Sequence, residues 1–75
     1  MQGRSTFTPA EAAELRELIR EKQTADRTRQ KALRARMRRI GFYISDFADY
    51  AGFTVSDFDD LVARGAVTID DARPA

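Results

Sequence analysis

The chain of 75 residues is long enough for one domain and carries a net charge of +1. It contains no cysteine and no histidine, which excludes a disulfide framework and thiolate or imidazole metal ligands, and removes the commonest general base of enzymes. We therefore expect a non-enzymatic protein that needs no cofactor. No apolar run approaches the roughly 18 residues of a membrane span, so we also expect no membrane partner.

Charge is divided unevenly along the chain. Residues 1–41 contain eleven basic and five acidic side chains, whereas residues 42–75 contain two basic and seven acidic ones. Six of the seven aromatic residues lie between Phe42 and Phe58. Such a difference in sign indicates a nucleic-acid or membrane-surface partner, or two halves that pack together and neutralise each other.

Residues 1–6 have neither the apolar run of a signal peptide nor a periodic pattern, so we expect disorder here and a cytoplasmic location. A first helix is predicted for residues 9–22. Thr8 is a suitable N-cap, Pro9 occupies the first helical position, and Glu11 completes a capping box. The apolar stripe of this helix consists of Leu15, Leu18 and Ile19.

A second helix is predicted for residues 26–40, after a break near residues 24–28 where the apolar stripe is interrupted and polar residues offer a new N-cap. We favour a helical hairpin with residues 9–22 as its first arm over one continuous helix of about 48 Å. In a hairpin, the glutamates of the first arm are expected to reach Arg36 or Arg39 of the second.

The stretch from Arg27 to Arg39 carries seven cationic side chains and no acidic one. On a helix, four of them share one face at spacings of four, three and four residues. Like charges four residues apart destabilise a helix by about 0.2–0.5 kcal/mol per pair, so this face requires compensating acids or an anionic partner. Arginines on such a face contact phosphate backbones without reading sequence. The candidate nucleic-acid-binding residues are Arg27, Lys31, Arg34, Arg38 and Arg39.

Two other interpretations of this basic helix stay open. Arginine is a good helix former and also solubilises a surface helix without any partner. The cations also have intramolecular candidates for neutralisation, namely Glu14, Glu17, Glu21 and the aspartates of the C-terminal half. A membrane-surface helix is disfavoured because the apolar stripe of Leu33, Met37 and Ile40 offers no aromatic anchor.

Gly41 is expected to end the second arm in a left-handed conformation. Residues 42–44 and 67–69 are short and rich in β-branched or aromatic side chains, which predicts two strands that pair with each other. From Asp70 onward we expect a loose tail, with residues 71–75 disordered.

Between the two predicted strands, the sequence indicates two short helices. Ser45 is a candidate cap for the first, which would end at Gly52. Thr54 and Asp57 form a capping-box-like pair at the start of the second, which is predicted to continue through residue 64. Phe53 and Phe58 occupy the positions of a hydrophobic staple around this start.

Residues 43–65 resemble the helix-turn-helix that opens the mercury-resistance-regulator family and the excisionases. The matching positions are Ala48 and Ala51 in the first helix, Gly52 in the turn, Thr54 at the cap of the second helix, and Phe58 and Leu61 facing inward. In that family the second helix enters the major groove of DNA. The exposed start of the corresponding helix in this chain carries Ser56, Asp57, Asp59 and Asp60. Phosphates repel carboxylates, so the resemblance implies the two-helix shape, while the charge disfavours base reading by this helix.

The three aspartates do not form a recognisable calcium loop, because the twelve-residue pattern with its glycine and final glutamate is absent. The sequence therefore predicts one small, mainly α domain over residues 1–75: a helical hairpin followed by a compact two-helix unit, with a minor two-stranded β element. The favoured function is binding of the phosphate backbone of DNA or RNA through the basic helix. The alternative is a protein–protein interaction module in which the helices associate with a second copy or another chain.

Overall fold

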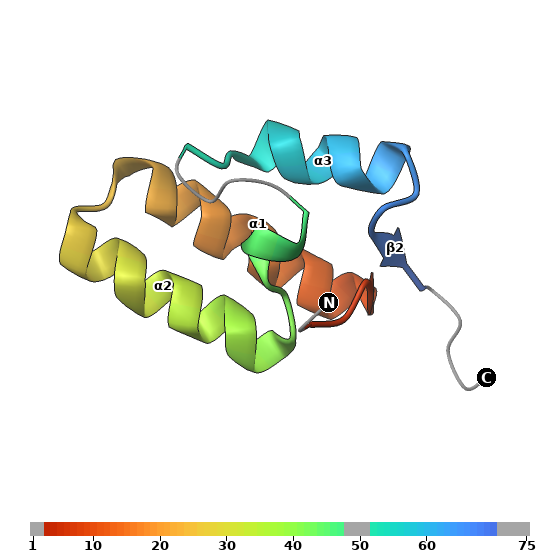
Figure 1. The fold of residues 1–75 in the computed structure, drawn as a ribbon, viewed down its shortest axis with the longest axis horizontal. Helices are drawn as coiled ribbons and strands as arrows, with labels where there is room; N and C mark the ends of the chain where they lie inside the picture. Colours follow the sequence, from red (N-terminus) through yellow and green to blue (C-terminus); the bar gives the residue numbers. More distant parts are fainter. Residues whose placement is uncertain (1–2, 48–51, 71–75) are drawn as a thin grey trace.

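The computed structural model describes residues 3–47 and 52–70. Its elements in chain order are β1 (Thr6–Phe7), α1 (Pro9–Thr24), α2 (Arg27–Ile40), a short 3-10 helix (Ile44–Asp46), α3 (Val55–Ala63) and β2 (Thr68–Ile69). Figure 1 shows α1 and α2 side by side, with α3 on the other side of α1 from most of α2. The fold is mainly α with a minor β element, as the sequence predicts.

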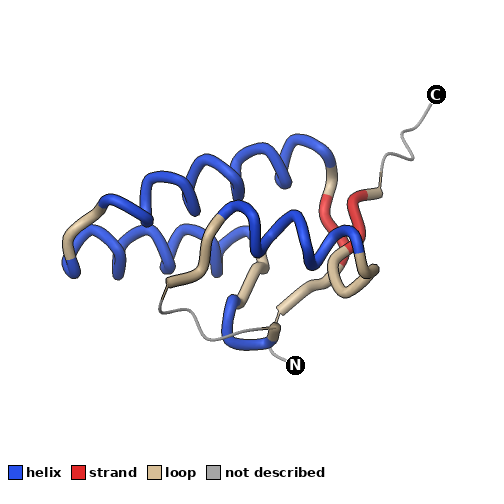
Figure 2. Tube along the Cα trace, turned by 90° about the horizontal axis from the view of Figure 1, so that it is seen from above, coloured by secondary structure: helices blue, strands red, loops and turns tan. Residues whose placement is uncertain are grey.

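The first two helices form the predicted hairpin. Thr8 and Glu11 make the full capping box at the start of α1, with each side chain accepting a hydrogen bond from the other residue's backbone N–H. The chain leaves the helix at Ala25, which is extended, and Asp26 caps α2 by accepting a hydrogen bond from the backbone N–H of Arg29 at 2.8 Å. The arms run side by side in both views (Figures 1 and 2).

Gly41 ends α2 as expected. Its φ of 108° is in the left-handed region, and its backbone N–H donates to the carbonyls of Met37 and Arg38. The backbone N–H of Phe42 donates to the Met37 carbonyl at 2.9 Å, which closes the helix end. The chain then turns sharply, and the Phe42 side chain enters the core.

The predicted two-helix unit is described in part. Residues 44–46 form a 3-10 helix, and the rest of the first predicted helix, at residues 48–51, lies outside the described residues. Helix α3 begins where predicted, because Thr54 and Asp57 exchange the two hydrogen bonds of a capping box at 3.2 and 3.0 Å. It ends at Ala63, one residue before the predicted end.

The predicted pairing of residues 42–44 with residues 67–69 is wrong. Strand β2 instead pairs in parallel with β1, with Thr6 opposite Thr68 and Phe7 opposite Ile69. The segment 42–44 is not a strand because its first amide is used at the end of α2 and its last residue begins the 3-10 helix.

The expectation of disorder at residues 1–6 is also wrong for the described residues 3–6. The backbone N–H of Arg4 donates to the Gly41 carbonyl at 2.7 Å, and that of Gly3 donates to Asp46 Oδ2 at 3.0 Å. The Arg4 guanidinium donates to both carboxylate oxygens of Glu11 and to the carbonyl of Ile40. The N-terminal segment is thereby fixed across the end of the hairpin.

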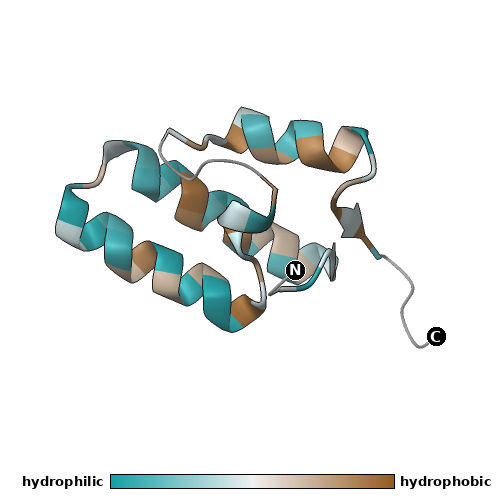
Figure 3. Ribbon diagram, in the orientation of Figure 1, coloured by the Kyte–Doolittle hydropathy of each residue, from teal (hydrophilic) through white to brown (hydrophobic). Residues whose placement is uncertain are grey.

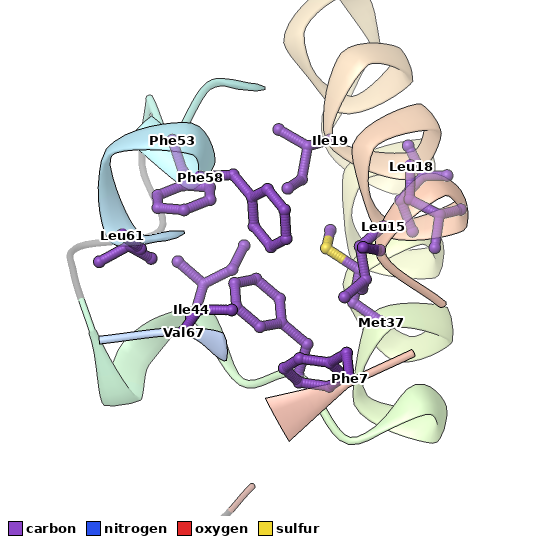
Figure 4. Close-up of a cluster of buried hydrophobic side chains, with 13 residues drawn as sticks. Phe7, Leu15, Leu18, Ile19, Met37, Ile44, Phe53, Phe58, Leu61 and Val67 are labelled. Carbon is purple, nitrogen blue, oxygen red and sulfur yellow. The ribbon is translucent and has the colours of Figure 1, made fainter. Parts of the chain in front are cut away.

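Within the described residues, thirteen buried apolar side chains from β1, the three α-helices, the 3-10 helix and the connecting segments form one core, and Ile69 of β2 packs against it half-buried. In Figure 4, side chains of α1 and α3 point toward one another, with Ile19 facing Phe58. Phe42 is fully buried and its ring contacts four other phenylalanine rings at centroid distances of 5.6 to 6.1 Å. The predicted staple residues Phe53 and Phe58 are both buried in this core.

Candidate nucleic-acid interface

Helix α2 buries one side and exposes the remainder. Leu33 and Met37 face the core, and Ile40 is half-buried beside them. Most of the α2 ribbon in Figure 3 has the teal colour of hydrophilic residues. The seven cationic side chains between Arg27 and Arg39 lie around the helix outside this narrow apolar side. Their positions around the helix axis divide them into three groups.

The first group lies on the flank of α2 that faces α1. Arg29 Nε donates to Glu21 Oε2 at 2.6 Å, and Arg36 Nη2 lies 3.8 Å from Glu14 Oε2. The predicted reach of the first-arm glutamates to Arg36 is thus confirmed. Because the hairpin is antiparallel, positions seven residues apart on one helix meet positions seven apart on the other. Two of the seven cations are neutralised in this way.

The second group lies on the opposite flank and consists of Arg27, Lys31, Arg34 and Arg38, which we call the basic row. Helical geometry places these four within about 60° of arc. Arg27, Lys31 and Arg38 are exposed, and Arg34 is half-buried. Within residues 3–47 and 52–70, no ion pair with a carboxylate involves the three exposed members.

The last cation, Arg39, belongs to neither flank. It lies about 100° around the helix from Arg38, on the exposed outer side of α2. The structure therefore brings four of the five candidate binding residues together and sets Arg39 apart from them. No ion pair within the described part of the chain involves Arg39.

Among the described residues, several carboxylates that were candidate partners of the basic helix have other partners, namely Glu17, Asp57, Asp59 and Asp60. The ion pairs away from α2 are Arg4–Glu11, Arg16–Asp59, Arg20–Glu17 and Arg64–Asp60, at 2.9, 2.8, 2.7 and 3.4 Å. Asp26 and Asp57 serve as helix caps. Of the acids that we considered as neutralising partners of the basic helix, Glu14 and Glu21 do reach it, at Arg36 and Arg29. Asp59 and Asp60 of α3 pair with cations outside α2.

Lys22 of α1 adds a further positive charge close to Arg34, and the sequence did not mark it as a candidate binding residue. It lies four residues after Leu18 on the stripe of α1, and its side chain is only 4% exposed. Burial lowers the pKa of its ammonium group, and the positive charge of Arg34 lowers this pKa further. In the sequence, the position of Lys22 four residues after Leu18 indicates only that the apolar stripe of α1 is interrupted by a charged residue.

The described surface at the basic row is hollowed very little. The hollow that Arg34 and Arg38 border has a volume of about 10 Å³, which is room for a single water molecule. Pockets for small ligands are typically several hundred Å³, so this hollow does not suit a small organic ligand. At the end of the row, the Arg38 guanidinium lies 5.7 Å from the centre of the Tyr43 ring.

The residues behind the helix-turn-helix resemblance have mixed placements. Gly52 has a φ of 77°, Thr54 caps α3, and Phe58 and Leu61 are buried. Ala48 and Ala51 lie outside the described residues. Among the residues that are described, no cluster of three or more acidic side chains suits a metal ion, and no helix is both long and apolar enough to span a bilayer.

Compared with known protein families, curated protein sequences and solved structures, this chain gives no match. The candidate interface is therefore defined by its own geometry and charge. Its main features, within the described residues, are the exposed side of α2, a row of cations on one flank of this helix, and several acids that pair with cations outside it.

Proposed function

We propose that this protein is a non-enzymatic nucleic-acid-binding protein that contacts the phosphate backbone of DNA or RNA through α2. The observation that carries this proposal is the absence of ion pairs to Arg27, Lys31 and Arg38 in the described chain, where most carboxylates have other partners. Cations spaced along one helix repel each other. A phosphate backbone relieves this repulsion and gains from the release of its own counterions.

The residue types suit this role. Arginine carries a planar group whose donors match two phosphate oxygens, and lysine supplies a compact charge on a flexible stem. Such contacts position a protein on nucleic acid but carry no sequence information. The paired and capping aspartates at the start of α3 are unsuited to an approach to phosphates, so we expect slight sequence preference.

The test is binding of the parent protein to a double-stranded oligonucleotide over a series of salt concentrations. If four phosphates are neutralised, log affinity falls against log salt with a slope of about −3.6. Replacing Arg27 and Lys31 together by glutamine should flatten this slope by about two units. Both side chains are exposed, so the double variant should keep its fold, as circular dichroism would verify.

A matched control separates the basic row from net charge. Replacing Arg20 and Arg64 by glutamine removes the same two charges from exposed positions outside α2, where each side chain pairs with a neighbouring acid. The loss of such surface pairs changes stability by about 0–1 kcal/mol. The control should bind almost as tightly as the parent. Equal weakening in both double variants would contradict the assignment to α2.

The protein-interaction alternative has its own outcome in the same experiment. A parent protein that binds no nucleic acid at about 50 mM salt, where electrostatic binding is strong, would contradict the proposed function. Loss of self-association on replacing Arg27 and Lys31, measured by sedimentation, would then assign the basic row to contacts between proteins.

A further inference from the structure

The form of the partner follows from the shape of the surface that carries the charge. Single-stranded nucleic acids are usually held in a positively charged groove. The basic row lies on the flank of an α-helix, which is a cylinder about 10–12 Å across, and among the described residues the hollow that the row borders has a volume of only about 10 Å³. A convex cationic surface fits a partner that is itself concave.

Aromatic side chains give a second argument against a single strand. Proteins that bind single strands stack bases on exposed rings, each worth about 1–3 kcal/mol. In the described chain, every aromatic side chain is buried or half-buried. The Tyr43 ring, at the end of the row, lies beneath the Arg38 guanidinium. On another side it is close to the backbone of Gly3, where an added Cβ would be 2.6 Å from a ring carbon of Tyr43. This ring is not available as a stacking platform.

The spread of charge around α2 also indicates a wide partner. Arg27, Lys31 and Arg38 lie on one flank, and Arg39 lies about 100° from Arg38 on the outer side. Along the axis, Arg27 and Arg38 are separated by about 16 Å at 1.5 Å per residue. A thin strand would follow one line of cations, whereas the two strands that border a groove would contact both sides of the helix.

We propose that the partner is double-stranded DNA and that α2 lies in its major groove. This inference rests on the proposed function and makes it more specific. The major groove of B-form DNA is about 12 Å wide and admits an α-helix. The corresponding groove of duplex RNA is deep and narrow, and side chains do not read it. The helix that enters the groove is α2, since the start of α3 carries Asp57, Asp59 and Asp60.

Helix α2 has the dimensions and accessibility that this placement requires. An α-helix with its side chains is about 10–12 Å across, close to the width of the groove. Between the basic row and Arg39, the exposed positions are Thr28 and Ala35, whose small side chains leave room for base edges. Phosphates on the two sides of the groove then face the basic row and Arg39 respectively.

The first experiment compares duplex DNA, duplex RNA and single-stranded DNA of equal length at one salt concentration. Binding to duplex DNA should be at least tenfold tighter than to the other two. Bound protein should also protect guanine N7, which faces the major groove, from methylation by dimethyl sulfate, and leave adenine N3 in the minor groove reactive.

A variant tests the position of the helix directly. Ala35→Phe places a bulky ring on the outer side of α2 and should weaken binding to duplex DNA at least tenfold. Ala63→Phe makes the same change at an exposed position of α3 and should leave affinity within twofold of the parent. Circular dichroism and melting of both variants would verify that the fold is retained.

The outcomes distinguish the two proposals. Tighter binding to single strands or to duplex RNA, or protection of adenine N3 instead of guanine N7, would overturn the placement in the major groove and leave backbone binding intact. Equal affinities of Ala35→Phe and the parent would also overturn that placement. Failure of the parent to bind any of the three polymers would overturn the proposed function itself.

Discussion

Phe42 is the residue on which the core converges. Its ring contacts Phe7 and Phe58 edge to face, stacks on Phe47, and meets Phe53 at an intermediate angle. Edge-to-face and offset rings contribute about 0.5–1.5 kcal/mol per pair beyond the area that they bury. One side chain thus links β1, the segment after α2 and the start of α3.

We predict that Phe42→Ala is the most damaging single truncation in this core. Removing a buried phenylalanine ring costs about 3–5 kcal/mol, which is a large part of the stability of a small domain. Phe47→Ala is the control, because Phe47 is only half-buried and touches Phe42 alone among the described rings. Denaturant unfolding should give a clearly smaller loss for the control. Equal losses would show that Phe42 has no central role.

At the scale of elements, α2 begins with the wrong charge for its own stability. The first turn of a helix favours acidic side chains, yet α2 has none there and starts with Arg27. Lys31 follows four residues later and repels Arg27. The helix is held by its Asp26 cap and by packing of Leu33 and Met37.

Arg27→Glu should therefore stabilise the protein while weakening nucleic-acid binding. The change gains about 0.3–1 kcal/mol from the helix dipole and a few tenths more from a favourable pair with Lys31. Arg27→Gln removes the cation without adding an acid. Its melting temperature should therefore lie between those of the parent and Arg27→Glu. A lower melting temperature for Arg27→Glu than for the parent would show that Arg27 does not destabilise the first turn of α2.

The sequence predicted these elements unevenly, for physical reasons. Capping residues act through neighbours in the chain, so Thr8 and Thr54 marked the starts of α1 and α3 correctly. The two-residue strands have no periodicity to detect, and the partner of β2 was therefore assigned to residues 42–44. Which cations of α2 pair with glutamates of α1 depends on the register between the two helices, and local sequence patterns do not determine this register.

At the scale of the whole molecule, Arg4 joins the N-terminal segment to both arms of the hairpin. It binds Glu11 of α1 and the last carbonyl of α2, and its guanidinium lies 5.0 Å from the centre of the Phe7 ring. Nothing in the local sequence marks this role, since each partner is reached only after the hairpin has formed.

The contact between Arg4 and Glu11 makes stability depend on pH. The hydrogen bond from Arg4 is the main cause that lowers the pKa of the Glu11 carboxyl, and backbone hydrogen bonding at Thr8 lowers it further. A carboxyl group with a lowered folded-state pKa stabilises the fold above its ordinary pKa of about 4.3 and loses this contribution as pH falls through the lowered value.

Melting temperatures measured from pH 6 down to pH 2 should therefore fall below about pH 4.3. The fall should be smaller in Arg4→Gln, which removes the main cause of the shift, than in the parent. Arg20→Gln is the control, because its ion pair with Glu17 lies within one helix. If the melting temperatures of the parent and Arg4→Gln depend on pH in the same way, Arg4 is not the main cause of the lowered pKa of Glu11.

The pairing of β1 with β2 has a consequence for the order in which the elements are expected to form. Thr6 is opposite Thr68, so this contact closes a loop that contains nearly the entire described chain, and the entropy of closing a loop grows with its length. The hairpin needs only local contacts, which form fast. During synthesis, residues 9–40 can assemble while Thr6 and Phe7 still lack their partner strand. We therefore expect the sheet, although it contains the first described strand, to be the last element to form.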